Sequence, residues 1–235
     1  MGNAFTASDW ELVRTRAANT AARLRGKGAT VWDFEPLPPV PRSQLDDFAR
    51  ETGLALPGDL ADLLTKFAGG WKFYWCLKLK ETDTWLKPPS FMGSFGGNAE
   101  VPFIGATKKD AVLDQYHSFQ AEIRNTYLDN PETLKVVAAL FPLHGWDGGG
   151  GDYTVLRLDV SPARVYYLDH EVGWPVDDRH ALGTGFREFL LGWSNLGFPQ
   201  CEYHSCWVNP ESRQPDDESA NADIWRTWLA DPGAA

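Results

Sequence analysis

Acidic and histidine side chains gather around a glycine-rich stretch in the second half of the chain, GWDGGGGD at 145–152. An enzyme could use such groups as acid and base beside a concave site. The candidates for this role are His144, Asp147, Asp152, His170 and His180. No nucleophile or triad spacing accompanies them, and histidines beside carboxylates are common on ordinary surfaces. We therefore expect that the chain is not an enzyme and has no catalytic residues.

The glycine loop at 145–151 does not fit the loops that bind phosphate or calcium. A phosphate loop of the Walker type needs Gly-Lys-Ser/Thr opening a helix, whereas Asp152 and a strand follow this loop. The alternating aspartates of an EF-hand are also absent. Four consecutive glycines supply the positive φ angles that other residues avoid, so we expect a structural turn.

A possible metal site lies in the C-terminal part, where three soft ligands stand close together: Cys201, His204 and Cys206. A structural zinc site normally uses four ligands in paired spacings, and the second pair is missing. The chain has 3 cysteines, too few and too odd in number for a disulfide framework. We expect no bound metal, no cofactor and a reducing compartment, by default the cytoplasm.

A β-hairpin is expected to position the acidic side chains. Residues 153–159 alternate with period two, which is typical of a half-buried strand, and Ser161-Pro162 turns the chain. The return strand covers 164–168, and a short apolar strand at 140–144 precedes the loop. Antiparallel pairing brings the start of one strand beside the end of the next. Six carboxylates can therefore meet at one end of the sheet: Asp147, Asp152, Asp169, Glu171, Asp177 and Asp178.

This acidic group is the predicted partner-binding surface. Mutual repulsion among its carboxylates destabilises the free protein, and a basic partner would relieve it. Carboxylates often merely solvate a surface, so a solvated acidic rim is the alternative interpretation.

Periodicity and turn residues place the other elements. A capping box at Ser8 and Glu11 predicts a helix to Gly26, followed by a stiff proline-rich linker at 36–41. Alternation predicts a strand at 71–80 with one core-facing row: Trp71, Phe73, Trp75, Leu77 and Leu79. Further helices are expected from Ser43, Pro57, Thr107, Pro131 and Gly185. An apolar stripe at 224–229 should dock on the body, with a partner or homodimer contact as the alternative.

Composition narrows the class of partner. The 235 residues carry a net charge of −10, which argues against nucleic-acid binding because phosphate contacts need a surplus of lysine and arginine. No run of eighteen apolar residues suggests a membrane-spanning segment. A basic protein is the partner that fits, and whether the chain forms homo-oligomers is left open.

The order of motifs resembles the SUKH superfamily, which includes bacterial immunity proteins and a yeast cell-wall-assembly regulator. The resemblance covers residues 43–197, and it rests on five pieces: LALPGDLADLLTKFAGG at 54–70, FYW at 73–75, LFPLHGWDGGGGDY at 140–153, VYYLDHEVG at 165–173 and FREFLLGWSNLGF at 186–198. It implies an α+β fold with a mainly antiparallel sheet flanked by helices. The expected organisation is a helix and linker at 1–41, a SUKH-like domain at 42–200 and a tail at 201–235.

The resemblance also implies a function in binding rather than catalysis. Many members of the superfamily resemble antidotes that block a cognate toxin, frequently a nuclease. The acidic composition fits such a role independently, because an acidic body can occupy the basic groove that a nuclease uses for phosphates. An intracellular regulatory or scaffold protein of the same superfamily is the alternative.

Overall fold

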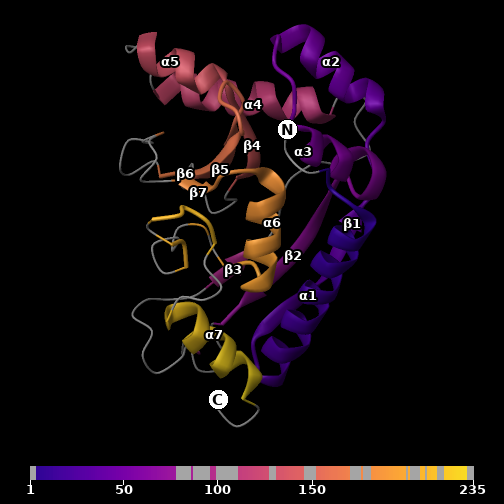
Figure 1. The fold of residues 1–235 in the computed structure, drawn as a ribbon, viewed down its shortest axis with the longest axis vertical. Helices are drawn as coiled ribbons and strands as arrows, with labels where there is room; N and C mark the ends of the chain where they lie inside the picture. Colours follow the sequence, from indigo (N-terminus) through magenta and orange to yellow (C-terminus); the bar gives the residue numbers. More distant parts are fainter. Residues whose placement is uncertain are drawn as a thin grey trace.

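The computed structural model describes residues 4–77, 86, 96–98, 111–126, 131–145, 152–169, 176, 181–199, 201, 207–209, 211–215 and 220–231. Over these residues the fold is α+β, as expected, with antiparallel strands flanked by helices (Figure 1). The helices are α1 (Ala7–Gly26), α2 (Arg42–Thr52), α3 (Gly58–Asp62), α4 (Ala111–Thr126), α5 (Pro131–Ala138), α6 (Phe186–Asn195) and α7 (Ala220–Ala230). A π-helical turn at Leu63–Phe67 continues α3.

The strands form two sheets. The first has the order β1-β2-β3, with β1 at Thr30–Leu37, β2 at Gly70–Cys76 and β3 at Gly96–Asn98. The second has the order β4-β5-β6-β7, with bounds Leu140–Gly145, Tyr153–Arg157, Arg164–Leu168 and Ala181–Gly183. All of these neighbours pair antiparallel. The predicted hairpin is confirmed, because Tyr153 pairs with Leu168 and Arg157 with Arg164.

Helices cover both faces of the β4–β7 sheet. On one face Val155 packs in a hydrophobic cluster with Phe119 and Ile123 of α4. On the other face Leu156 belongs to the main cluster, which includes Phe189 of α6. The prediction that β5 is half-buried is therefore wrong, since Thr154, Val155 and Leu156 are all buried. A strand between two layers of helices has no solvated face.

The β1–β3 sheet buries the face that alternation predicted for the core. Trp71, Phe73, Trp75 and Leu77 are buried in the main cluster, and Leu79, the last residue of the predicted row, lies outside the described residues. Phe198, which follows α6, lies with its ring centroid 5.5 Å from that of Phe73. Because α6 also packs on β6 and β7, this helix lies between the two sheets (Figure 1).

The first helix belongs to the core rather than to a separate appendage. Val13, Ala17 and Leu24 of α1 are buried in the main cluster, and Trp10 lies 6.1 Å from Trp71 between ring centroids. The linker predicted at 36–41 overlaps β1, whose residues Pro36 and Leu37 pair with β2. The periodicity predicted this helix, but it did not predict that the apolar face of α1 packs on the β1–β3 sheet.

The last helix docks on the body, as the apolar stripe predicted. Trp225 of α7 stacks on Trp75 of β2, with 5.6 Å between ring centroids, and its Nε1 donates to the carbonyl of Leu196 at 2.8 Å. Lys27 at the end of α1 places its Nζ 4.6 Å from the centroid of the Trp228 ring. In the parts of the chain that the structure describes, no helix combines the length and apolar character needed to span a membrane.

Candidate functional site

The antiparallel register brings two of the predicted site residues together. Tyr153 and Leu168 form the last pair of β5 and β6, so Asp152 and Asp169 come next at the same end of the sheet. Gly145 at the end of β4 pairs with Tyr153, which places the start of the glycine loop at this end as well. The predicted convergence of the two strand ends is thus confirmed for Asp152 and Asp169.

Asp152 is held in a defined position at this sheet end. The hydroxyl of Tyr167 donates a hydrogen bond of 3.0 Å to Oδ2 of Asp152. Both Asp152 and Asp169 are half-buried. A partly desolvated carboxylate interacts more strongly with an opposing cation than a fully solvated one does. The geometry therefore suits recognition of a basic group.

The other predicted residues of the acidic group lie outside the described residues: Asp147, Glu171, Asp177 and Asp178. The same is true of His170 and His180 from the catalytic alternative, and for His144 the structure describes only its place in β4. Their roles stay predictions.

The metal alternative can be followed at one of its three residues, because His204 and Cys206 also lie outside the described part. Cys201 is buried, and burial raises the pKa of its thiol to about 12. A thiol that stays protonated is a poor metal ligand. Among the described residues, no group of three or more potential ligands is placed to hold a metal ion.

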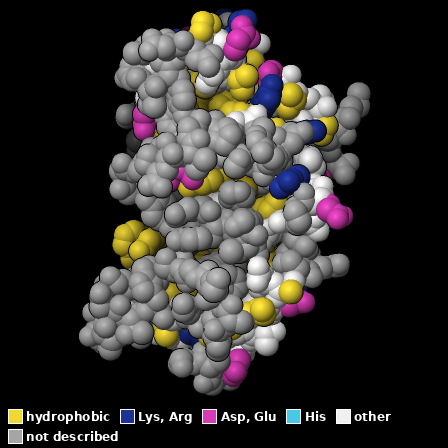
Figure 2. All heavy atoms as spheres, turned by 90° about the vertical axis from the view of Figure 1, so that its left-hand side faces the viewer, with side chains coloured by type: hydrophobic (Ala, Val, Ile, Leu, Met, Phe, Trp, Pro, Cys, Tyr) yellow, Lys and Arg dark blue, Asp and Glu magenta, His cyan; other side chains and the backbone are white. Residues whose placement is uncertain are grey.

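The described residues contribute only scattered charge to the face of the molecule that Figure 2 shows. In Figure 2, acidic and basic side chains of the described residues are interspersed and form no continuous patch of one sign. Net acidity alone therefore does not locate a binding surface on this face.

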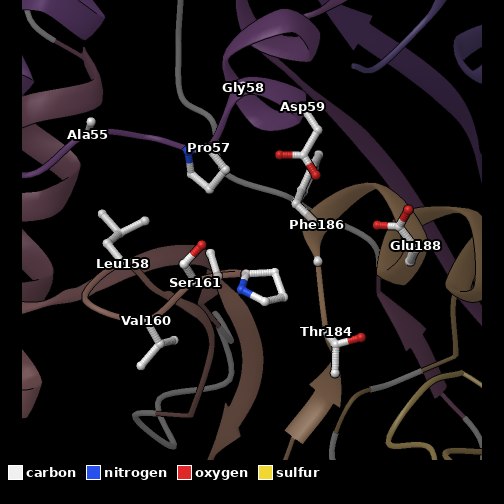
Figure 3. Close-up of a pocket in the computed structure, with 13 residues that line it drawn as sticks. Ala55, Pro57, Gly58, Asp59, Leu158, Val160, Ser161, Thr184, Phe186 and Glu188 are labelled. Carbon is white, nitrogen blue, oxygen red and sulfur yellow. The ribbon is translucent and has the colours of Figure 1, made fainter. Parts of the chain in front are cut away.

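The structure adds a pocket that the sequence did not predict, at the opposite end of the β4–β7 sheet. It has a volume of about 620 Å³ and lies between the start of α3, the turn that joins β5 to β6 and the start of α6. Figure 3 shows Asp59 and Glu188 on one side of this pocket and Leu158 and Val160 on the other. The hydroxyl-bearing residues Ser161 and Thr184 also line it.

Asp59 joins the two helices that begin at the pocket. Its Oδ1 accepts from the backbone N–H of Leu60 in α3, and its Oδ2 accepts from that of Arg187 in α6, both at 2.9 Å. Burial raises the pKa of the Asp59 carboxyl above its usual value; these hydrogen bonds oppose the shift and the charge of Glu188 adds to it. The carboxylate thus occupies the positive N-terminal end of α6, which disfavours an anionic ligand there.

Glu188 lies over the start of α6 because a glycine permits its close approach. Gly185 has φ of 148°, and a Cβ at this position would lie 2.6 Å from Oε2 of Glu188. The neighbouring Arg187 directs its guanidinium to Asp9, at 2.7 and 3.0 Å, and its Nη1 is 3.6 Å from Glu188. The only basic side chain beside the two carboxylates in the described part of α6 is therefore already engaged with Asp9.

The sequence held only weak signals for this pocket. Asp59 follows Pro57-Gly58 and Glu188 is the third residue of α6, positions at which acidic residues ordinarily stabilise helix starts. Nothing in the spacing places the two residues, 129 positions apart, in one cavity.

The comparisons with known proteins add no family. The chain matches no protein-family model, and neither a curated protein nor a solved structure matches it. Membership of the SUKH superfamily stays a prediction based on the motif order.

Proposed function

We propose that the chain is a non-enzymatic protein of the immunity type, which binds and neutralises a cognate protein toxin in the cytoplasm. The proposed contact surface is the acidic rim, defined as Asp152 and Asp169 together with the four acidic residues that the sequence predicts beside them: Asp147, Glu171, Asp177 and Asp178. The observation that supports it is the register of β5 and β6, which brings Asp152 and Asp169 to one end of the sheet.

The physical argument for a basic partner rests on charge. The chain carries −10, and two of its carboxylates are half-buried side by side at the rim. An opposing basic surface would relieve their repulsion, and long-range attraction would raise the association rate. Such attraction is screened by salt, so association should slow as ionic strength rises. A nuclease toxin fits this description, because its substrate groove must be basic.

Charge reversal at the rim tests the proposal. We would replace Asp169, Glu171, Asp177 and Asp178 by Lys together and measure the affinity for the toxin encoded beside the gene, as well as protection of cells. We expect affinity to fall about 100-fold or more, since four repulsive contacts replace attractive ones. Thermal unfolding of the variant must first show that it folds.

A matched control distinguishes the effect of charge reversal at the rim from the effect of a changed net charge. Reversal of four exposed carboxylates elsewhere changes the charge equally: Glu11, Asp33, Asp46 and Glu132. The control should keep most of its affinity. If both variants lose affinity alike, or if the rim variant still protects cells, the rim is not the contact surface. Absence of protection by the unmodified chain would favour a regulatory or scaffold role instead.

A further inference from the structure

The pocket between α3, the β5–β6 turn and α6 shows an unequal distribution of charge. Its lining contains two carboxylates, Asp59 and Glu188, and no basic side chain. The nearest cation in α6, Arg187, forms its two short hydrogen bonds with Asp9 of α1, and it reaches Glu188 only through a longer ion pair of 3.6 Å. The pocket therefore presents negative charge that the surrounding described side chains compensate only in part.

The opposite wall of the pocket is apolar. Leu158 and Val160 face the carboxylates across the hollow, and Pro57 lies between them at the start of α3 (Figure 3). Lysine and arginine side chains combine an aliphatic stem with a cationic end, and they bury the stem along apolar surface. A volume of about 620 Å³ admits such a side chain together with adjoining backbone.

We propose that this pocket is a docking site for a lysine or arginine side chain of a protein partner, with the stem against Leu158 and Val160 and the cation between Asp59 and Glu188. The site is separate from the acidic rim. The rim lies at the start of β5 and the pocket at its end, and five strand residues separate them by about 17 Å. The inference therefore stands whether or not the rim binds a toxin.

A peptide with blocked ends tests the proposal directly, because it carries the basic side chain and no terminal charge. We would titrate the full chain with acetyl-Ala-Ala-Lys-Ala-Ala-amide and follow backbone amide signals by NMR. Saturable shifts should centre on Ser161, Thr184 and Phe186. The same peptide with norleucine in place of lysine should bind with an affinity at least about tenfold lower, since it lacks the charge-assisted hydrogen bonds.

Two variants assign the binding to the carboxylates. Glu188→Gln removes one charge from a side chain that is 45 % exposed, and it should weaken lysine-peptide binding about tenfold. Asp59→Asn should weaken it as well, and its unfolding curve shows whether the fold persists. Glu132→Gln on α5 is the matched control, because this exposed glutamate lies outside the pocket lining, and it should bind like the unmodified chain.

Three results would overturn the proposal. Equal binding of the lysine and norleucine peptides would show that the carboxylates recognise no cation. Shifts centred outside the pocket, or an unchanged affinity of Glu188→Gln, would place the site elsewhere. Tighter binding of the free diamine cadaverine than of the lysine peptide would identify the pocket as a site for a small amine rather than for a protein side chain.

Discussion

Asp9 and Arg187 join the first helix to the helix between the two sheets. Nη2 and Nε of Arg187 donate to the two carboxylate oxygens of Asp9 at 2.7 and 3.0 Å. The Thr6 hydroxyl and backbone N–H also donate to Oδ2 of Asp9, at 2.8 and 2.9 Å. Burial alone would raise the pKa of Asp9, but these hydrogen bonds outweigh it and hold the pKa below its usual value of 3.8.

Replacement of Asp9 by Asn should lower the free energy of unfolding by about 1–3 kcal/mol at neutral pH, because hydrogen bonds to a charged group are lost. A lowered folded-state pKa means that this stabilisation is complete above pH 3.8 and disappears as pH falls through the folded value. Urea unfolding at several pH values measures the difference, which should shrink in acid.

The exposed Glu11, replaced by Gln on the same helix, provides the control and should change stability little. A difference between Asp9→Asn and the unmodified chain that grows as pH falls would contradict the assignment.

At the scale of single residues, the sequence predicted a capping box at the start of α1 but not the residues that form it. A capping box was expected at Ser8 and Glu11, and the structure forms it two residues earlier with Thr6 and Asp9. Both pairs have the same spacing, so local chemistry does not distinguish them. The Asp9 of the observed box also pairs with Arg187, which is 178 positions away, and sequence spacing contains no information about such a partner.

Strands β1 and β2 form an element with two very different faces. Trp75 is fully buried, and its Nε1 donates to the carbonyl of Gly197 at 2.9 Å. Trp32 on the opposite face is 61 % exposed, with its ring centroid 4.9 Å from that of Tyr74. Substitutions of these two tryptophans therefore compare a residue of the buried face with a residue of the exposed face in one pair of strands.

Truncation of Trp75 to Ala should lower the free energy of unfolding by about 3–5 kcal/mol, the range for large aromatic deletions in cores. The control, Trp32→Ala, should lower it by about 1 kcal/mol or less, because the residue loses one ring contact and little burial. Chemical unfolding followed by circular dichroism measures both. Similar losses from the two variants would show that the exposed face is covered in solution.

Helices and strands whose apolar residues recur with a clear period were predicted from the sequence, and those without such a period were missed. The helix expected from Thr107 rests on apolar residues at spacings of four, three and four, and these are buried in α4: Val112, Tyr116, Phe119 and Ile123. β1 was missed because its alternation breaks at an irregular register between Trp32 and Glu35, and because Pro36 argues against a strand. β3 and β7 have three residues each, too few for any period to be visible.

At the scale of the whole molecule, the first helix α1 and the last helix α7 pack against each other and contribute to the same hydrophobic core. Trp225 and Trp228 of α7 are buried, and Lys27 at the end of α1 donates to the carbonyl of Asp231 at 2.5 Å. Figure 1 shows α7 beside the C-terminal end of α1. The packing of the first helix is thus completed by the last one.

Deletion of residues 220–235 should leave helices and strands in place but loosen the core, because the Trp75 face loses its cover. We expect retained far-ultraviolet circular dichroism, a weaker near-ultraviolet signal and binding of a hydrophobic dye. Deletion of 232–235 alone is the control and should show none of these changes. A full-strength near-ultraviolet signal after the longer deletion would contradict this role of α7.

The arrangement of the whole molecule was the least predictable level. The α+β class followed from the resemblance to the SUKH superfamily, and the structure confirms it. The split into two sheets did not, because it depends on α6 packing between them through residues that read as one ordinary apolar stripe. The two carboxylates of the rim were placed by register, which the hairpin determined locally. The pocket required three distant segments and could not be foreseen.

The joining of α1 to α7 has a consequence for the order of events during synthesis. A ribosome completes α1 and β2 long before it reaches α7, so Trp75 of β2 lacks its contact with Trp225 while the rest of the chain is made. We therefore expect the native core to form only after the last helix has emerged. Until then the nascent chain exposes apolar surface of the kind that chaperones bind.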